Sequence, residues 1–179
     1  SRAEISYYNA AGQQVKRAYV YANVWDFTLS DETYTDSAFS IDKGSIGSYS
    51  NLSENRTVDD AYVEYYDFML KFRLCGYLLP YEITDERADK YLDNPRVTAF
   101  AILMDEEHYG GSGYRTDEQV IASWNKLLTN DVWMEKGYFY LGDEPYSEGD
   151  FQFIRNKWNY YTNLLGVDKI PNMTPMAGN

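Results

Sequence analysis

The sequence predicts an α/β fold, namely about four β/α units of a TIM-type (β/α)8 barrel, preceded by a β-hairpin. Strand-like and helix-like segments alternate four times after residue 30, which favours right-handed parallel crossovers. The strand-like run 97–103 is continuously apolar, as in strands buried on both faces of a parallel sheet. The chain has 179 residues, whereas a complete barrel takes about 250. We therefore expect a partial barrel.

The first 29 residues are predicted to form a β-hairpin. Ile5–Tyr8 is a short strand, Asn9–Gly12 has the composition of a turn, and Val15–Phe27 is a long β-branched and aromatic run. Because a lone hairpin is marginally stable in water, we expect it to be the remnant of a β-sandwich. The expected domains are this hairpin over 1–29 and the first half of a barrel over 30–179.

The later elements follow from capping and periodicity. Ser or Thr followed by acidic residues predicts where each main helix begins. The expected helices are 58–74, 84–92, 116–128 and 147–165, and the expected strands are 37–41, 77–79, 97–103, 138–141 and the beginning of a fifth at 169–173. The Gly- and Ser-rich segment 43–55 is expected to be a long loop. This alternation fits a doubly wound sheet as well as a half barrel.

Composition narrows the function classes. With 16 Lys and Arg against 28 Asp and Glu, the net charge is −12, so we expect no nucleic-acid partner. No apolar stretch approaches the ~18 residues of a membrane span. A single Cys and a single His leave no disulfide framework and no cysteine-based metal site. No phosphate-binding glycine motif occurs. We expect no cofactor and no metal, and the acidic run Asp105–His108 is interpreted as solvated.

Acidic residues recur where the predicted strands end, and active sites of parallel β/α folds form there. The most suggestive group is Asp143-Glu144-Pro145, directly after the apolar strand 138–141. Pro145 is expected to hold Glu144 in an extended conformation, and aromatic neighbours could desolvate one carboxyl and favour its protonated form. The alternative is a solvated approach to the next helix. The 19 tyrosines suit stacking on sugars, or simply a core.

Adjacent carboxylates do not suit an ordinary acid and nucleophile pair, which must flank the scissile bond. They suit a substrate-assisted mechanism, in which the 2-acetamido oxygen of the sugar attacks the anomeric carbon. One carboxyl then protonates the leaving oxygen, and the other holds the amide N–H.

Three stretches carry a family resemblance: Val24–Leu29, Ser37–Asp42 and Tyr138–Pro145. They resemble the catalytic domain of glycoside hydrolase family 123, also catalogued as domain of unknown function 4091, in which a β-sandwich leads into a (β/α)8 barrel. The resemblance spans 15–42 and 137–175. Ser30 and the segment 43–55 depart from the family pattern, which leaves the substrate open.

The resemblance implies a retaining, β-N-acetylgalactosaminidase-like glycoside hydrolase with a glycan as its partner. Glu144 would be the general acid/base, and Asp143 would orient the acetamido group. The implied location is secreted, periplasmic or on the surface of a bacterium. Further substrate-binding residues are expected at Asp42, Tyr81, Asp105, His108, Tyr109 and Tyr146.

Two other interpretations remain open, a sugar-binding module without chemistry and an interaction fragment. Because the chain opens without Met in a strand-like segment, we expect a piece of a longer protein. Such a half barrel would pair with its missing half or self-associate through its sheet edges. The three functions differ in whether acids from several strand ends converge on one pocket.

Overall fold

The computed structural model describes residues 1–28, 30–31, 33, 35–49, 52–53, 55–104 and 115–175. The chain forms two compact units, Ser1–Ser30 and Asp31–Asn179. The first is an antiparallel hairpin, and the second combines helices with a three-stranded parallel sheet. The protein therefore has a mixed α/β fold.

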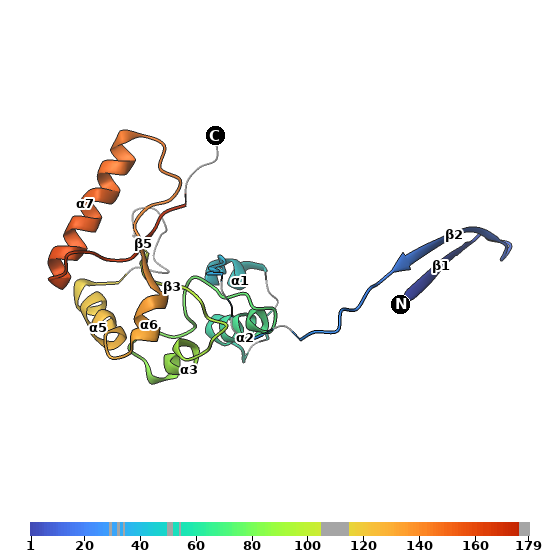
Figure 1. Cartoon of the computed structure of the whole chain (residues 1–179), viewed down its shortest axis with the longest axis horizontal. Coiled ribbons are helices and arrows are strands. Elements are labelled where there is room, and N and C mark those ends of the chain that lie inside the picture. Colours follow the sequence, from blue (N-terminus) through green and yellow to red (C-terminus); the bar gives the residue numbers. More distant parts are fainter. Residues whose placement is uncertain are drawn as a thin grey trace. The chain divides into compact units, whose positions relative to one another are not determined.

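The hairpin pairs β1 (Arg2–Tyr8) with β2 (Gln14–Tyr21), as Figure 1 shows. The side-chain oxygen of Asn9 closes the turn by accepting from the backbone N–H groups of Ala11 and Gln13, at 3.0 and 2.9 Å. The expected second strand was too long. The N–H of Ala22 donates to the carbonyl of Ser1 at 2.9 Å, and beyond that bond the segment 23–27 has no paired strand among the described residues.

The three long helices begin at capping boxes, as the sequence predicts. In each box the side chain of the N-cap residue accepts a backbone N–H from the third helical residue, whose own side chain accepts from the N-cap backbone. Gly166 ends the last helix with a φ of +66°, which glycine adopts at little cost. The helices are α2 (Val58–Lys71) after Thr57, α5 (Asp117–Leu127) after Thr116, and α7 (Glu148–Leu165) after Ser147.

The structure contains two short helices that the sequence interpretation missed. The segment expected as a long loop begins with α1 (Lys43–Tyr49). This helix forms because the Asp42 carboxylate accepts the backbone N–H of Ser45 at 2.6 Å, and because Ile46 is buried in the core. Similarly, Asn130 caps α6 (Asp131–Lys136).

The parallel sheet has the order β3 (Phe100–Met104), β4 (Gly137–Tyr140) and β5 (Asn172–Met173). All five residues of β3 are buried, which confirms the prediction of a strand covered on both faces. The expected fifth strand is reduced to two residues.

Two further extended segments continue this array. The N–H of Ala101 in β3 donates to the carbonyl of Tyr77 at 2.6 Å. Phe39 forms a parallel bridge with Gly76. At the expected strands 37–41 and 77–79 the structure therefore has only isolated strand-like contacts and no full strand. Even so, the segments at Phe39 and at residues 76–77 are linked in chain order to the parallel strands β3, β4 and β5.

The two faces of the array differ. Phe139 of β4 faces the helices, where its ring lies 6.0 Å from Trp124 of α5 and 5.4 Å from Tyr161 of α7. Its neighbours Tyr138 and Tyr140 belong to the opposite face, which we call the helix-free face. Among the described residues no helix contributes to that face. Its buried members are Leu78, Ala99, Ala101, Met104 and Tyr138, and Ala38, Tyr77, Tyr140 and Met173 pack against them.

Tyrosines account for much of the helix-facing core. The hydroxyls of Tyr62 and Tyr66 on α2 donate to the carbonyls of Leu78 and Gly76, at 2.9 and 3.3 Å. The Tyr91 ring lies edge-on to Tyr66 at 5.2 Å. Each hydroxyl finds a backbone acceptor or a carboxylate, which is why these rings can be buried. The high tyrosine content is thus partly a feature of the core.

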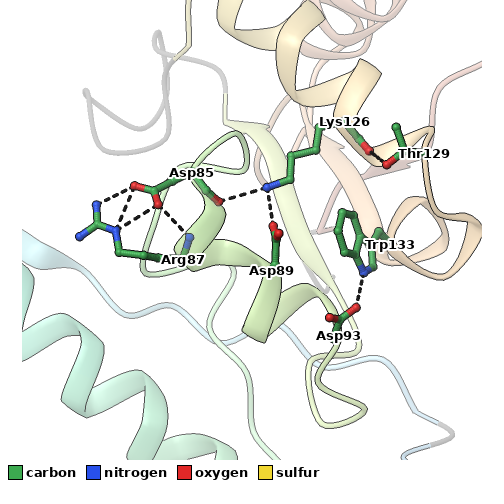
Figure 2. Close-up of polar contacts among 7 residues, drawn as sticks. All are labelled: Asp85, Arg87, Asp89, Asp93, Lys126, Thr129 and Trp133. Carbon is green, nitrogen blue, oxygen red and sulfur yellow. Dashed lines mark hydrogen bonds and ion pairs between the residues drawn. The ribbon is translucent and has the colours of Figure 1, made fainter.

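Polar contacts fix α5 and α6 to the short helix α3 (Asp89–Leu92) and to the 3-10 turn Glu86–Ala88 before it (Figure 2). Lys126 of α5 donates to the carbonyl of Asp85 at 3.1 Å and to the Asp89 carboxylate. Trp133 of α6 donates to Asp93 at 2.8 Å. The helical layer behind β3 and β4 is therefore held by side chains as well as by apolar packing.

None of the helices in the described part of the chain combines the length and the apolar character that crossing a membrane requires.

Candidate active site

The loop after β4 carries both expected catalytic residues and is held tightly against α7. Leu141 and Pro145 are buried. A Cβ built on Gly142 would come within 2.7 Å of the side chain of Ile154 on α7, so only glycine fits there without a shift. The positions between these contacts, 143 and 144, are exposed. The backbone that presents the two carboxyls is thus fixed from both sides.

Asp143 is oriented by its own strand. The hydroxyl of Tyr140 donates to Oδ1 of Asp143 at 2.9 Å. Burial raises the pKa of Tyr140, and the charges of Tyr77 and Glu144 raise it further. The phenol therefore remains a protonated donor at neutral pH.

Glu144 adopts a backbone conformation that the sequence interpretation got wrong. Its φ is +41°, whereas an extended conformation was expected because Pro145 follows. The left-handed region costs an L-residue about 1–2 kcal/mol. Here the N–H of Glu144 donates to the carbonyl of Pro175, beyond β5, at 3.0 Å, and burial of Pro145 anchors the other side. Such strained positions cluster at functional sites. The Glu144 side chain is exposed, so the described residues do not give it the expected aromatic shielding.

Asp42 stabilises a helix. Its carboxylate accepts the N–H of Ser45, and the hydrogen bonds from Ser45 and Gly44 lower the pKa of Asp42. The carboxylate is therefore held as an anion by the N-terminus of α1. The proposed substrate-binding role of Asp42 stays a prediction.

Tyr81 lies in a different place from the acids. The Arg87 guanidinium lies over its ring, 4.2 Å from the centroid, and the Tyr91 ring is 6.1 Å away. Tyr81 lines a cleft of about 340 Å³ together with Lys43, Asp59 and other residues from α1, α2 and the segment 78–87. Neither Asp143 nor Glu144 lines this cleft, so it does not join Tyr81 to them.

The remaining expected site residues divide into two groups. Tyr146 is separated from the acidic pair only by Pro145, and it is 88% exposed. Asp105, His108 and Tyr109 lie outside the described residues. In the part of the chain that is described, no three His, Cys, Asp or Glu side chains gather as metal ligands would.

Sequence reasoning did not single out three further residues. Tyr140 and Tyr77 could have been found from strand alternation, which puts Tyr140 three residues before Asp143 on the face that Tyr138 also occupies. The third is Arg115, which is 7% exposed and donates to Glu82 at 3.0 Å and to the carbonyl of Ile102 at 2.9 Å. No local signal marks it, because its partners are distant in sequence.

A comparison with protein-family models finds no match to this chain, and a comparison with curated proteins finds none either. The chemistry of the site therefore has to be argued from its own residues.

Proposed function

We propose that this chain carries the catalytic acids of a glycoside hydrolase that cleaves a β-linked 2-acetamido sugar by substrate assistance. The observation that carries the proposal is the rigid presentation of Asp143 and Glu144 at the carboxyl end of β4. Asp143 is fixed by Tyr140, and Glu144 is held at a φ of +41° by its bond to Pro175. Groups that are held in place in this way can stabilise the charge that develops in a transition state.

In the proposed reaction Glu144 gives its proton to the glycosidic oxygen as the bond to the anomeric carbon breaks. The carbonyl oxygen of the 2-acetamido group bonds to that carbon from the opposite face and forms a cyclic oxazolinium ion. Asp143 accepts the N–H of this group and balances its positive charge. Glu144 then takes a proton from a water molecule whose oxygen bonds to the anomeric carbon. The bond between that carbon and the acetamido oxygen breaks, which opens the ring and restores the original anomeric configuration.

The arrangement of the sheet supports the half-barrel form of this proposal. The segments at Phe39 and at residues 76–77 and the parallel strands β3, β4 and β5 are linked in chain order, and no described helix contributes to the helix-free face. A doubly wound sheet reverses its strand order and carries helices on both faces, whereas a barrel does neither. The resemblance to glycoside hydrolase family 123 agrees with this interpretation. We further propose that the hairpin derives from a β-sandwich and that the enzyme is secreted, periplasmic or on the cell surface of a bacterium.

A sugar-binding module is the second candidate, and one observation favours it. Tyr146 is 88% exposed beside the acidic pair, as an aromatic platform for a sugar ring would be. A module of this kind binds glycan without forming product, and its binding survives replacement of Glu144 by Gln.

The test is hydrolysis of 4-nitrophenyl N-acetyl-β-D-galactosaminide by the full chain. The reaction is measured as the amount of nitrophenol released. We expect turnover at mildly acidic to neutral pH, with retention of configuration in the released sugar by proton NMR. Sugar binding without release of nitrophenolate would instead support the binding module. Inversion of configuration would contradict substrate assistance.

We also expect this chain to self-associate. A half barrel exposes two sheet edges and a face that a second half would cover, and Tyr77, Tyr140 and Met173 on the helix-free face are only partly buried. Light scattering across a concentration series should therefore show a mass that rises above 20.8 kDa. A monodisperse monomer with full hydrolytic activity would show that the half-barrel interpretation is wrong.

A further inference from the structure

Tyr140 connects the helix-free face with the acidic loop. Its hydroxyl donates to Oδ1 of Asp143 at 2.9 Å. The two residues are separated by Leu141, which is buried, and by Gly142, whose backbone lies against Ile154. Both ends of the hydrogen bond are therefore attached to fixed backbone. The bond restrains the rotation of the Asp143 carboxylate, which is otherwise an exposed side chain.

We propose that Tyr140 is a positioning residue, which occupies Oδ1 of Asp143 and so turns Oδ2 toward the N–H of a ligand amide. The inference rests on the proposed function and adds to it how the acetamido group is selected. An ionised carboxylate only accepts hydrogen bonds. The hydrogen bond from Tyr140 to one oxygen fixes the plane of the carboxylate, and with it the directions in which the other oxygen accepts. A 2-acetamido group supplies that donor.

The surroundings of Tyr140 support this role. The side chain is partly buried among the helix-free residues, so few rotamers are open to it. Burial, together with Tyr77 and Glu144, keeps its pKa above the ordinary tyrosine value. The hydroxyl therefore keeps its proton at neutral pH, so that Tyr140 is the donor of the hydrogen bond to Asp143.

The first experiment needs no ligand. Tyrosines labelled with ¹³C at Cζ give one signal each, and the Tyr140→Phe spectrum identifies the signal of Tyr140. We expect that signal to shift in Asp143→Asn, because the anionic acceptor is lost, and to stay in place in Glu148→Gln, which removes an exposed charge in the first turn of α7. If the Tyr140 signal keeps its chemical shift in Asp143→Asn, the inference is overturned.

The second experiment compares two sugars by NMR titration, N-acetylgalactosamine and galactose. Tyr140→Phe should bind N-acetylgalactosamine about tenfold more weakly, as expected for an interaction with a charged group, and should bind galactose as the wild type does. The control Tyr138→Phe should bind both sugars normally.

The outcomes separate the inference from the proposed function. Equal weakening of both sugars means a merely structural role and overturns the inference alone, as does unchanged binding of N-acetylgalactosamine. Wild-type binding of N-acetylgalactosamine without hydrolysis overturns the proposed enzyme but leaves the ligand preference intact. A wild-type chain that binds neither sugar overturns both.

Discussion

Replacing Glu144 by Gln should reduce hydrolysis of the nitrophenyl substrate by about 10²–10⁴, the usual contribution of a general acid or base. The amide keeps the size of the side chain and cannot give a proton to the leaving oxygen. Because the side chain is exposed, its replacement should leave the fold intact. The backbone at φ +41° is equally strained for Glu and Gln, so the melting temperature should stay within about a degree or two of the wild type.

Two companion variants sharpen this expectation. Glu148→Gln, a matched change of an exposed acid in the first turn of α7, should keep wild-type turnover. Asp143→Asn should also lower the rate strongly, without removing the limb of the pH profile that is due to the general acid, the fall in rate at high pH, because Glu144 still carries the transferred proton. Wild-type turnover in a folded Glu144→Gln protein would show that another group is the acid.

The parts of the fold that could be predicted depend on short-range signals. The boxes at Thr57, Thr116 and Ser147 need only residues within one helical turn, and all three were found. The helix α1 was missed because its Gly and Ser content favours a loop, whereas Asp42 and the burial of Ile46 decide the outcome. Strand lengths were overestimated because pairing depends on a distant partner. The segment after Tyr21 has β-forming residues and no paired strand in the described structure.

The candidate site shows the same division. The position of Asp143 and Glu144 after a strand followed from the pattern of apolar residues. The left-handed backbone of Glu144 did not, because the local rule for a residue before proline predicts the opposite. In the structure the N–H of Glu144 donates to the carbonyl of Pro175, which follows α7 in the sequence, and this distant contact accompanies the left-handed conformation. Asp42 shows a second role that the sequence interpretation did not predict, since its carboxylate caps the helix α1.

Replacing Phe139 by Ala should destabilise the Asp31–Asn179 unit by about 3–5 kcal/mol, the range for truncating a buried aromatic residue. Phe139 is fully buried, and Trp124 and Tyr161 lie against its ring from two different helices. The cavity would therefore open at the junction of β4, α5 and α7. For a domain of marginal stability this loss is a large share of the total. The loss in the free energy of unfolding can be measured by urea denaturation, with tryptophan fluorescence as the signal.

The adjacent residue provides the control, because it lies on the other face of the same strand. Tyr138 is 7% exposed, and its hydroxyl has no hydrogen-bond partner among the described residues. Burying a hydroxyl without a partner is costly, at about 1–3 kcal/mol. Tyr138→Phe removes that group and keeps the ring, so it should leave stability unchanged or raise it by up to about 1 kcal/mol. A loss of stability in Tyr138→Phe would mean that the hydroxyl is hydrogen-bonded in solution. A small effect of Phe139→Ala would contradict the assignment of Phe139 to the helix-facing core, because truncating a buried ring there should leave a cavity.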